Sequence, residues 1–408
     1  MAHFWQGLRS GEWLTLARAR GYSLILLALC IVAMAGWVAL SDGLIDRNGK
    51  PIGTDFSNVY AAGDLAWQGR AADAYDPPLQ HASEKAVFGR DVPFYGWPYP
   101  PFFLGVAFLA AALPYAWGLS VWLAASFAAY LATIRAILPR KETLLIATAF
   151  PAVFVNIGHG QNGFLTTALL GGALHLLARR PWLAGVLIGL LTYKPQFGVL
   201  IPVALVAGGH WRAIGTATAT VIALLALSTL MLGAGIWHAF AGSTTFMQTV
   251  VLETGGIGWE KIQSIFSAVR MWGGSVPLAY AAQIALAVTL IATLAWLWRS
   301  DAAFELKAAA LAVGSLLATP YVLDYDLVVL GLAIAYLARL GLAQGFRSFE
   351  ISALAAAWIV PLMSRGIAQI TAIPLGLSVL LLLYLLIMRR TLQDRALVTF
   401  DAPFIAQG

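Results

Sequence analysis

The sequence predicts an all-α, polytopic membrane protein with about twelve transmembrane helices. Of its 408 residues, 60% are hydrophobic and only 11% are charged, whereas soluble domains carry about 25% charged residues. The mean hydropathy is +0.79. Long apolar runs recur between Tyr22 and Met388, and runs of about 18 or more residues are typical of membrane-spanning helices. The runs do not alternate as barrel strands do, so helices must satisfy the backbone hydrogen bonds in lipid.

The first apolar run, 22–41, is predicted to be an uncleaved helix. It follows Arg9, Arg18 and Arg20 and is long enough for a full span, whereas a signal peptide has a shorter apolar core and a small-residue cleavage site. The single cysteine, Cys30, lies in this run, which excludes an intrachain disulfide. The net charge of +6 comes from basic residues at the ends of apolar runs, as at a membrane surface, so we expect no nucleic-acid partner.

Residues 1–408 are predicted to form a single membrane domain without an internal repeat. Two connections between the spans are long, at 42–100 and 234–276, and the others are short. The predicted spans are 22–41, 101–113, 117–137, 143–157, 163–178, 182–207, 212–233, 277–298, 305–319, 325–340, 350–363 and 371–388.

Basic residues near the span ends predict the orientation, because they favour the cytoplasmic side. The arginines before the first span place the N-terminus in the cytoplasm, and twelve spans then place both long loops outside. Two basic clusters conflict with this topology. The twelve spans place Arg140/Lys141 and Arg179/Arg180 outside, whereas basic residues favour the cytoplasm. We expect a multi-pass protein of a bacterial inner membrane, with its active site facing the periplasm.

The first outer loop, 42–100, is predicted to be a folded cap on the membrane that contains short membrane-parallel helices. Between Gly43 and Pro100 it carries seven of the 19 acidic residues of the chain. Residues 60–68 are predicted to form a short surface helix that ends at Gly69. The loop returns through Trp-Pro-Tyr-Pro-Pro at 97–101, where the prolines end any helix and the aromatic residues suit the lipid–water interface.

Asp55 is the first candidate for chemistry. It lies in a Gly-Thr-Asp-Phe context about a dozen residues after the first span. A carboxylate that is partly buried beside aromatic residues at a membrane surface can act as a general base. The alternative is a helix N-cap, a position at which Asp is favoured.

Lys194 is the second candidate, because a lysine within the apolar run 182–207 is costly unless it faces a wet cavity or an anion. Pro195 breaks the helix at this point and frees backbone groups to line such a cavity. A phosphate is the ligand that we expect. The alternative is a lysine near a helix end whose ammonium group reaches the interface.

Gly-His-Gly-Gln-Asn-Gly at 158–163 joins two short apolar runs. The three glycines predict a tight polar turn, which either is a plain connection or presents His159, Gln161 and Asn162 to a ligand.

Residues 319–326 carry Asp324 and Asp326, a D-x-D pair with which many sugar-transferring enzymes hold a metal through oxygen ligands. The alternative is that Asp324 caps the next helix. The sequence contains no metal-binding histidine pair, no phosphate-binding P-loop motif and no dinucleotide fingerprint.

A set of short motifs occurs along the chain in a fixed order. They are D-F at 55–56, Y-A-A-G at 60–63, Y-D-P at 75–77, Y-P-P at 99–101, G-Q-N-G at 160–163, A-G-V-L-I-G-L-L-T-Y-K-P-Q-F at 184–197 and P-Y-V-L-D-Y-D-L at 320–327. Over residues 53–330 this ordered set resembles glycosyltransferase family 87, whose members are membrane enzymes of the GT-C fold and include polyprenyl-phosphate-mannose-dependent mannosyltransferases.

The resemblance implies a hexosyltransferase that moves a hexose, with mannose expected, from a polyprenyl-phosphate sugar to a lipid or glycan acceptor. Transfer takes place at the outer face of the membrane with inversion at the anomeric carbon. Asp55 matches the catalytic carboxylate and is implied to be the general base. Lys194, with an Arg or His near the outer face, is implied to hold the leaving phosphate.

The residues expected to contact substrate are Lys194, Gln161, Asn162, His159, Tyr60, Tyr99, Tyr321, Asp324, Tyr325 and Asp326. We expect no cofactor and no metal site, although a divalent metal would be compatible with the D-x-D pair. The chain departs from the family in lacking a histidine near the outer end of the later spans. A secondary transporter or polyprenyl-phosphate flippase is the alternative, but such proteins usually contain paired broken helices, and only the span at Lys194 is predicted to be broken.

Overall fold

The computed structural model describes residues 2–401, and within this range it contains helices and three isolated β-bridges but no β-strand. Seven helical segments are long and apolar enough to cross a membrane, which confirms the prediction of a polytopic helical membrane protein. They are α2 (Leu16–Ala39), α6 (Tyr115–Ile137), α12 (Trp211–Leu232), α15 (Val276–Arg299), η6 with α17 (Asp324–Gln344), α18 (Glu350–Thr371) and α19 (Leu375–Asp401).

The remaining helices are shorter. They are α1 (Ala2–Ser10), α3 (Phe56–Trp67), η1 (Ala71–Tyr75), α4 (Pro77–Phe88), η2 (Pro101–Phe103), α5 (Leu104–Ala110), α7 (Thr143–Thr148), α8 (Pro151–His159), α9 (Gly163–Leu176), α10 (Pro181–Leu191), η3 (Pro195–Gly198), α11 (Ile201–Ala207), α13 (Gly235–Met247), the π-helical η4 (Gln248–Glu253), η5 (Trp259–Lys261), α14 (Ile265–Met271) and α16 (Phe304–Leu317).

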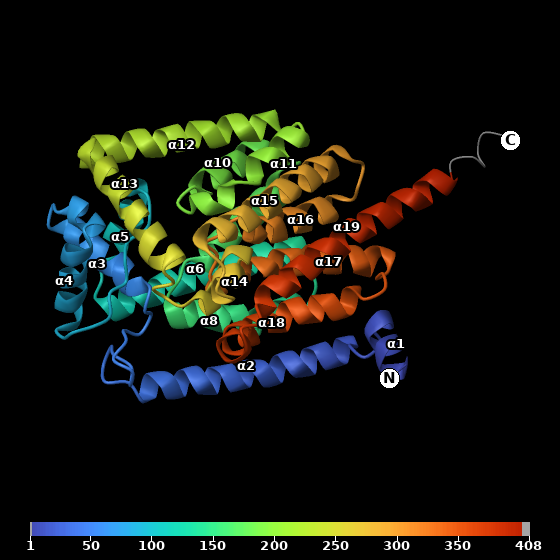
Figure 1. Ribbon diagram of the computed structural model, residues 1–408, viewed down its shortest axis with the longest axis horizontal. Helices are drawn as coiled ribbons and strands as arrows, with labels where there is room; N and C mark the ends of the chain where they lie inside the picture. Colours follow the sequence, from blue (N-terminus) through green and yellow to red (C-terminus); the bar gives the residue numbers. More distant parts are fainter. Residues whose placement is uncertain (1, 402–408) are drawn as a thin grey trace.

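Both long predicted loops lie at the same end of the molecule, which we call the cap end. Figure 1 shows α3, α4, α5 and α13 together at the left, whereas α1 and the last turns of α19 lie at the right, which we call the terminal end. The two loops are in contact, because Ser243 Oγ donates to the Trp97 carbonyl (3.2 Å) and the Tyr75 and Phe240 rings lie 5.8 Å apart. They therefore form one continuous layer.

The first loop folds into the short helices that the sequence predicts. Helix α3 begins four residues earlier than expected and ends before Gly69, whose φ is +73°. At Gly63 it packs directly on α5, where a Cβ atom would lie 2.1 Å from the Ala107 carbonyl oxygen. Figure 1 shows α4 lying across the direction of the long helices α2 and α12. This arrangement agrees with a folded cap.

Segment 101–113 was predicted to be a span, but it does not cross the helical body. Helices η2 and α5 comprise ten residues (Pro101–Ala110), which extend about 15 Å, half of the hydrocarbon thickness of about 30 Å. The chain after them is still at the cap end, because the Leu113 carbonyl accepts from the Tyr60 hydroxyl (2.9 Å). The Tyr115 hydroxyl, at the start of α6, donates to the Ile52 carbonyl (2.8 Å).

The first conflict in the predicted topology disappears as a result. Since α6 starts at the cap end, it finishes at the terminal end, where Glu142 forms an ion pair with Arg20. The cluster Arg140/Lys141 therefore lies at the same end as the N-terminal arginines.

The second basic cluster, Arg179/Arg180, also lies at the terminal end. Helices α7 and α8 return to the cap end, and α9 then runs parallel to α6. Near the start of α9 the Phe164 ring lies 5.1 Å from Phe127, and further along Gly171 packs against Thr133. The cluster Arg179/Arg180, which follows α9, consequently also lies at the terminal end.

The predicted span 182–207 is an up-and-back hairpin. Helix α10 runs parallel to α12, because Gly185 packs against Thr216 and Gly189 packs against Thr220. The chain breaks at Lys194 and returns through η3 and α11 to Gly208, which packs against Trp298 near the end of α15. The hairpin and segment 101–113 each remove one predicted crossing. Because two crossings are removed, the helices from α12 onward keep their predicted directions.

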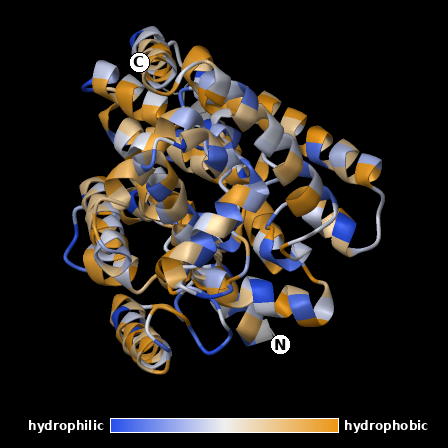
Figure 2. Ribbon diagram, turned by 90° about the vertical axis from the view of Figure 1, so that its left-hand side faces the viewer, coloured by the Kyte–Doolittle hydropathy of each residue, from blue (hydrophilic) through white to orange (hydrophobic). Residues whose placement is uncertain are grey.

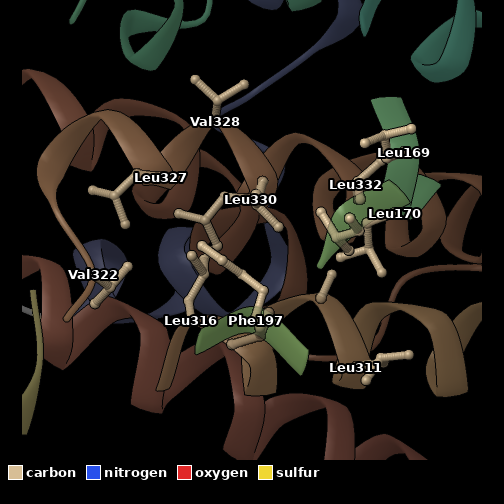
Figure 3. Close-up of a cluster of buried hydrophobic side chains, with 14 of the residues drawn as sticks. Leu169, Leu170, Phe197, Leu311, Leu316, Val322, Leu327, Val328, Leu330 and Leu332 are labelled. Atoms are coloured by element: carbon tan, nitrogen blue, oxygen red, sulfur yellow. The ribbon is translucent and has the colours of Figure 1, made fainter. Parts of the chain in front are cut away.

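The core lies around α16, η6 and α17. In the most apolar stretch of the η6–α17 span 72% of the residues are buried, compared with 6% in α2, so α17 is the central helix and α2 is peripheral. Figure 3 shows side chains from α9, η3, α16 and η6–α17 meeting in this core. Figure 2, which faces the cap end, shows hydrophobic residues along most helices and hydrophilic residues both in connections and on several helical turns.

We predict that Lys141 is accessible from the same side of the membrane as Gly345. The test introduces single cysteines at Lys141, Gly345 and Asn48, all exposed, into a Cys30→Ser background. Labelling with a membrane-impermeant maleimide should group Lys141→Cys with Gly345→Cys and separate both from Asn48→Cys. Grouping of Lys141→Cys with Asn48→Cys would support the twelve-span topology instead.

Candidate active site

Asp55 lies at the junction between the cap and the membrane helices. It occupies the N-cap position of α3, but its side chain accepts no capping hydrogen bond. Oδ2 accepts from Gln161 Nε2 (3.1 Å), and Oδ1 lies 3.9 Å from His159 Nδ1. The side chain remains 18% exposed, so a ligand can reach the carboxylate.

The turn after α8 brings Gln161 and His159 to Asp55. The backbone N–H of Asp55 donates to the His159 carbonyl (2.8 Å), and a hydrogen bond joins Thr54 Oγ1 to His159 Nδ1 (2.9 Å). Gly160 has a φ of +64°, and a Cβ atom here would lie 2.7 Å from Phe56 Cβ. Only glycine satisfies both demands at this position. The predicted polar turn therefore docks directly on the start of α3.

A buried network fixes the orientation of the Gln161 amide. Its Oε1 accepts from the Tyr99 hydroxyl (3.3 Å) and from the Asn162 backbone N–H (2.8 Å). The Tyr99 hydroxyl in turn accepts from Asn162 Nδ2 (2.7 Å). Because Oε1 is occupied as an acceptor, the amide nitrogen must face Asp55 as a donor.

Segment 319–326 forms another wall of the candidate site, next to His159. The His159 and Tyr325 rings lie 5.5 Å apart. Asp324 Oδ1 accepts from the Tyr325 N–H (2.9 Å), and Oδ2 lies 3.9 Å from Arg365 Nη1 of α18. The backbone N–H of Leu323, at the N-cap of η6, donates to Asp326 Oδ2 (3.0 Å), so Asp326 is the residue that closes this helix start.

Lys194 lies deeper and is paired with Asp326. The distance between Nζ and Oδ1 is 2.5 Å, and both side chains are almost fully buried. The ammonium group also lies 5.4 Å from the centre of the Tyr325 ring and 5.7 Å from that of Phe197. The positive charge in the broken span is therefore compensated within the protein.

Two tyrosines near Asp55 have hydroxyl groups that bond to no residue in the part of the chain that the structure describes. Burial, followed by the charge of Asp55, raises the pKa of Tyr95 and of Tyr321, so both are protonated donors at neutral pH. Tyr60, in contrast, uses its hydroxyl on the Leu113 carbonyl and packs against Tyr115. Tyr95 and Tyr321 are thus available to a ligand.

Part of the chain that forms the candidate site, including Tyr99, Gln161 and Lys194, matches a known family, whereas Asp55 and Asp324 lie outside the match. The model of glycosyltransferase family 87 matches residues 97–320, more than half of the chain. This chain belongs to glycosyltransferase family 87. It is therefore a membrane glycosyltransferase, and the resemblance inferred from the motifs is confirmed. No curated protein and no solved structure matches the chain.

Two residues that approach the glycosyltransferase site from other elements were not identified from the sequence. Arg365 comes from α18, beyond the matched region, and Lys261 comes from η5. Burial, and next the charge of Arg365, lowers the pKa of Lys261, whereas Asp324 and Asp55 act in the opposite direction. The two residues are far apart in the sequence and lie in no shared motif, so no local pattern could have predicted their convergence.

Glu84, in α4, was also not identified. Its side chain is fully buried, and both carboxylate oxygens accept from the Tyr95 N–H (3.2 and 3.0 Å). Burial raises the pKa of Glu84 to about 8, and the charge of Asp55 acts in the same direction. The glycosyltransferase cap therefore contains a carboxyl group that is mostly protonated at neutral pH.

Within residues 2–401, no group of three His, Cys, Asp or Glu side chains could hold a metal ion. The two members of the D-x-D pair have separate partners, since Asp324 lies near Arg365 and Asp326 binds Lys194.

We predict that Lys194→Met destabilises the fold by about 3–5 kcal/mol, because it leaves Asp326 as an unpaired buried carboxylate. Thermal unfolding in detergent measures the change. Adding Asp326→Asn should restore most of the lost stability, and Lys141→Met at an exposed site is the control. Normal stability of Lys194→Met with loss of donor binding would instead assign Lys194 to the substrate phosphate.

We predict that the stability gained by Glu84→Gln increases with pH. With its pKa raised from 4.5 to about 8, Glu84 holds more proton in the folded than in the unfolded protein between these values. The free energy of unfolding of the parent must therefore fall as the pH rises through this window, and the loss is complete above about pH 8. Melting temperatures measured from pH 5 to 9 should diverge in favour of Glu84→Gln; a constant difference would contradict the assignment.

Proposed function

We propose that this glycosyltransferase moves a hexose, mannose being the first candidate, from a polyprenyl-phosphate sugar to a lipid or glycan acceptor. Asp55 is the general base. The observation that carries this proposal is the Asp55 carboxylate, which Gln161 orients as an acceptor and which solvent can reach at the junction of cap and membrane helices. The alternative N-cap role is unsupported, because the side chain makes no capping bond.

The proposed reaction is a single displacement. The acceptor hydroxyl transfers its proton to Asp55 as its oxygen forms a bond to the anomeric carbon. The bond between this carbon and the phosphate oxygen breaks on the opposite face, and the electron pair leaves with the phosphate. The configuration at the anomeric carbon is therefore inverted.

The hydrogen-bond donors around Asp55 suit a sugar. The hydroxyl groups of Tyr95 and Tyr321, which bond to no described residue, supply donors that hexose hydroxyls can accept. A site whose polar groups await a partner rejects ligands that lack the matching groups, because the buried donors would remain unsatisfied. These groups support a sugar ligand without selecting one hexose.

The arrangement of charge supports the proposed location. Both basic clusters that conflicted with the twelve-span topology lie at the terminal end, together with the N-terminal arginines, and such residues favour the cytoplasm. We infer that the cap and Asp55 face the opposite side, the periplasm if the membrane is a bacterial inner membrane. A polyprenyl chain would then remain in the lipid around the helices.

The test is turnover of polyprenyl-phosphate sugars by the purified protein, with mass spectrometry of the released polyprenyl phosphate. Asp55→Asn should lower the rate by a factor on the order of 10²–10⁴ while donor binding is kept. Asp64→Asn, on the same helix but bonded only to Gln68, is the matched control and should retain the parental rate.

The same assay tests the remaining parts of the proposal. We propose that no divalent metal takes part, so turnover should continue in EDTA; loss of turnover that Mg²⁺ or Mn²⁺ restores would contradict this. Movement of polyprenyl phosphate across vesicles without bond cleavage would favour the flippase alternative. Turnover of Asp55→Asn within about threefold of the parent would exclude Asp55 as the base.

A further inference from the structure

Lys261 and Arg365 approach the site together from two elements that are held against each other. Lys261 ends η5, and Arg365 lies in the last two turns of α18. The two elements are joined by a hydrogen bond from Gln369 Nε2 to Glu260 Oε1 (3.3 Å). Next to them, the backbone N–H of Gln263 donates to the Val322 carbonyl (2.8 Å). The positions of the two cations are therefore set by the backbone that also carries Asp324.

The two cations keep free donors. Within residues 2–401 neither the ammonium group of Lys261 nor the guanidinium group of Arg365 makes a hydrogen bond, and the nearest carboxylate oxygen to Arg365, on Asp324, is 3.9 Å away. Arg365 is about one-third exposed, and Lys261 is half-buried. Both donors can therefore be reached by a ligand.

Two other basic residues in this region, Arg270 and Lys194, are already occupied. Arg270 donates to the carbonyls of Gly274 (2.6 Å) and Glu253 (3.0 Å) and stacks on Trp259. Lys194 is bound to Asp326. Among the described residues, Arg270 and Lys194 use their donors in hydrogen bonds, whereas Lys261 and Arg365 do not, although Arg365 has Asp324 as a neighbour at 3.9 Å.

Placing two like charges near each other in a partly buried site is unfavourable unless an anion lies between them. The mutual effect is visible here, because the charge of Arg365, after burial, lowers the pKa of Lys261. Asp55 and Asp324 both act on Lys261, and Arg365 lies 3.9 Å from Asp324, so Lys261 is within electrostatic reach of the proposed base.

We infer that Lys261 and Arg365 bind the phosphate of the lipid-linked donor and stabilise it as the leaving group. This inference rests on the proposed function. When the bond between sugar and phosphate breaks, a phosphodiester monoanion becomes a phosphate monoester with one further negative charge. Cations fixed beside that oxygen bind the product-like transition state more strongly than the ground state, which accelerates the reaction.

The assignment gives the phosphate, which the sequence analysis expected Lys194 to hold, to other residues. Lys194 holds Asp326 and the start of η6 in place, whereas the phosphate is bound by side chains from η5 and α18. Arg365 lies outside the region matched by the family model. The C-terminal helices of this chain would thus contribute directly to its active site.

Binding of undecaprenyl phosphate to the full-length protein in nanodiscs tests the inference, because this probe contains the phosphate and lacks the sugar. Arg365→Gln and Lys261→Gln should each weaken binding by about tenfold, as expected for loss of a charge-assisted hydrogen bond. Arg365→Lys should lie between Arg365→Gln and the parent, since it keeps the charge but loses the planar fork. Binding of undecaprenol, which has no phosphate, should be unchanged in all variants.

Two controls separate this inference from the proposed function. Asp55→Asn should bind undecaprenyl phosphate like the parent while losing turnover, and Arg90→Gln, which removes a cap arginine paired with Asp42, should change neither. Parental binding by both Arg365→Gln and Lys261→Gln would overturn the inference and leave the proposed function intact. Failure of the parent to bind undecaprenyl phosphate or to cleave any donor would overturn both.

Discussion

The Gln161 side chain is the interaction on which the candidate site depends. One end of its amide is held by the Tyr99 hydroxyl and the Asn162 N–H, and the other end donates to Asp55. Three segments that are distant in sequence therefore meet through a single side chain, and two of its three bonds are buried. An amide that cannot rotate presents a fixed donor, so Asp55 is oriented as an acceptor by a neutral group.

The thickness of the bilayer is the second constraint, and it explains the topology. A helix needs about 20 residues to cross the hydrocarbon core, and the ten residues Pro101–Ala110 cannot do so. Once this segment remains in the cap, the direction of α6 and α9 follows, and both discordant basic clusters join the N-terminal arginines. The basic clusters all lie on one side of the membrane. The conflict arose because the predicted topology counted segments 101–113 and 182–207 as crossings.

Charge in the site is arranged in two layers. The deeper layer is neutral overall, because Lys194 and Asp326 compensate each other beneath Tyr325. The other layer combines the reachable carboxylate of Asp55 with Asp324 and the cations Lys261 and Arg365, which make no hydrogen bond among the described residues. A displacement at a sugar carbon needs a base on one face and stabilisation of the leaving group's charge on the other, and these are the roles that we propose for Asp55 and for the pair Lys261/Arg365.

The sequence by itself determined the class of the protein, because helix-length apolar runs leave no other way to satisfy the backbone in lipid. It also determined the family, since the ordered motifs from Asp55 to Leu327 are local features of the chain. Asp55, His159, Gln161, Asn162 and Tyr99 could be selected because each lies in such a motif, and the structure brings them together. Whether they contact substrate is still a prediction.

Tertiary structure decided what depends on long-range pairing. Lys194 has the same local sequence whether it faces a phosphate or Asp326, and the two residues are 132 positions apart. Glu84 and Arg365 carry no local signal, because burial and proximity are properties of packed helices. The segments 101–113 and 182–207 are apolar enough to span, and only their contacts with α3 and α12 show that they do not cross. Composition and periodicity report how a segment interacts with solvent, whereas the choice among partners is made only when the helices pack.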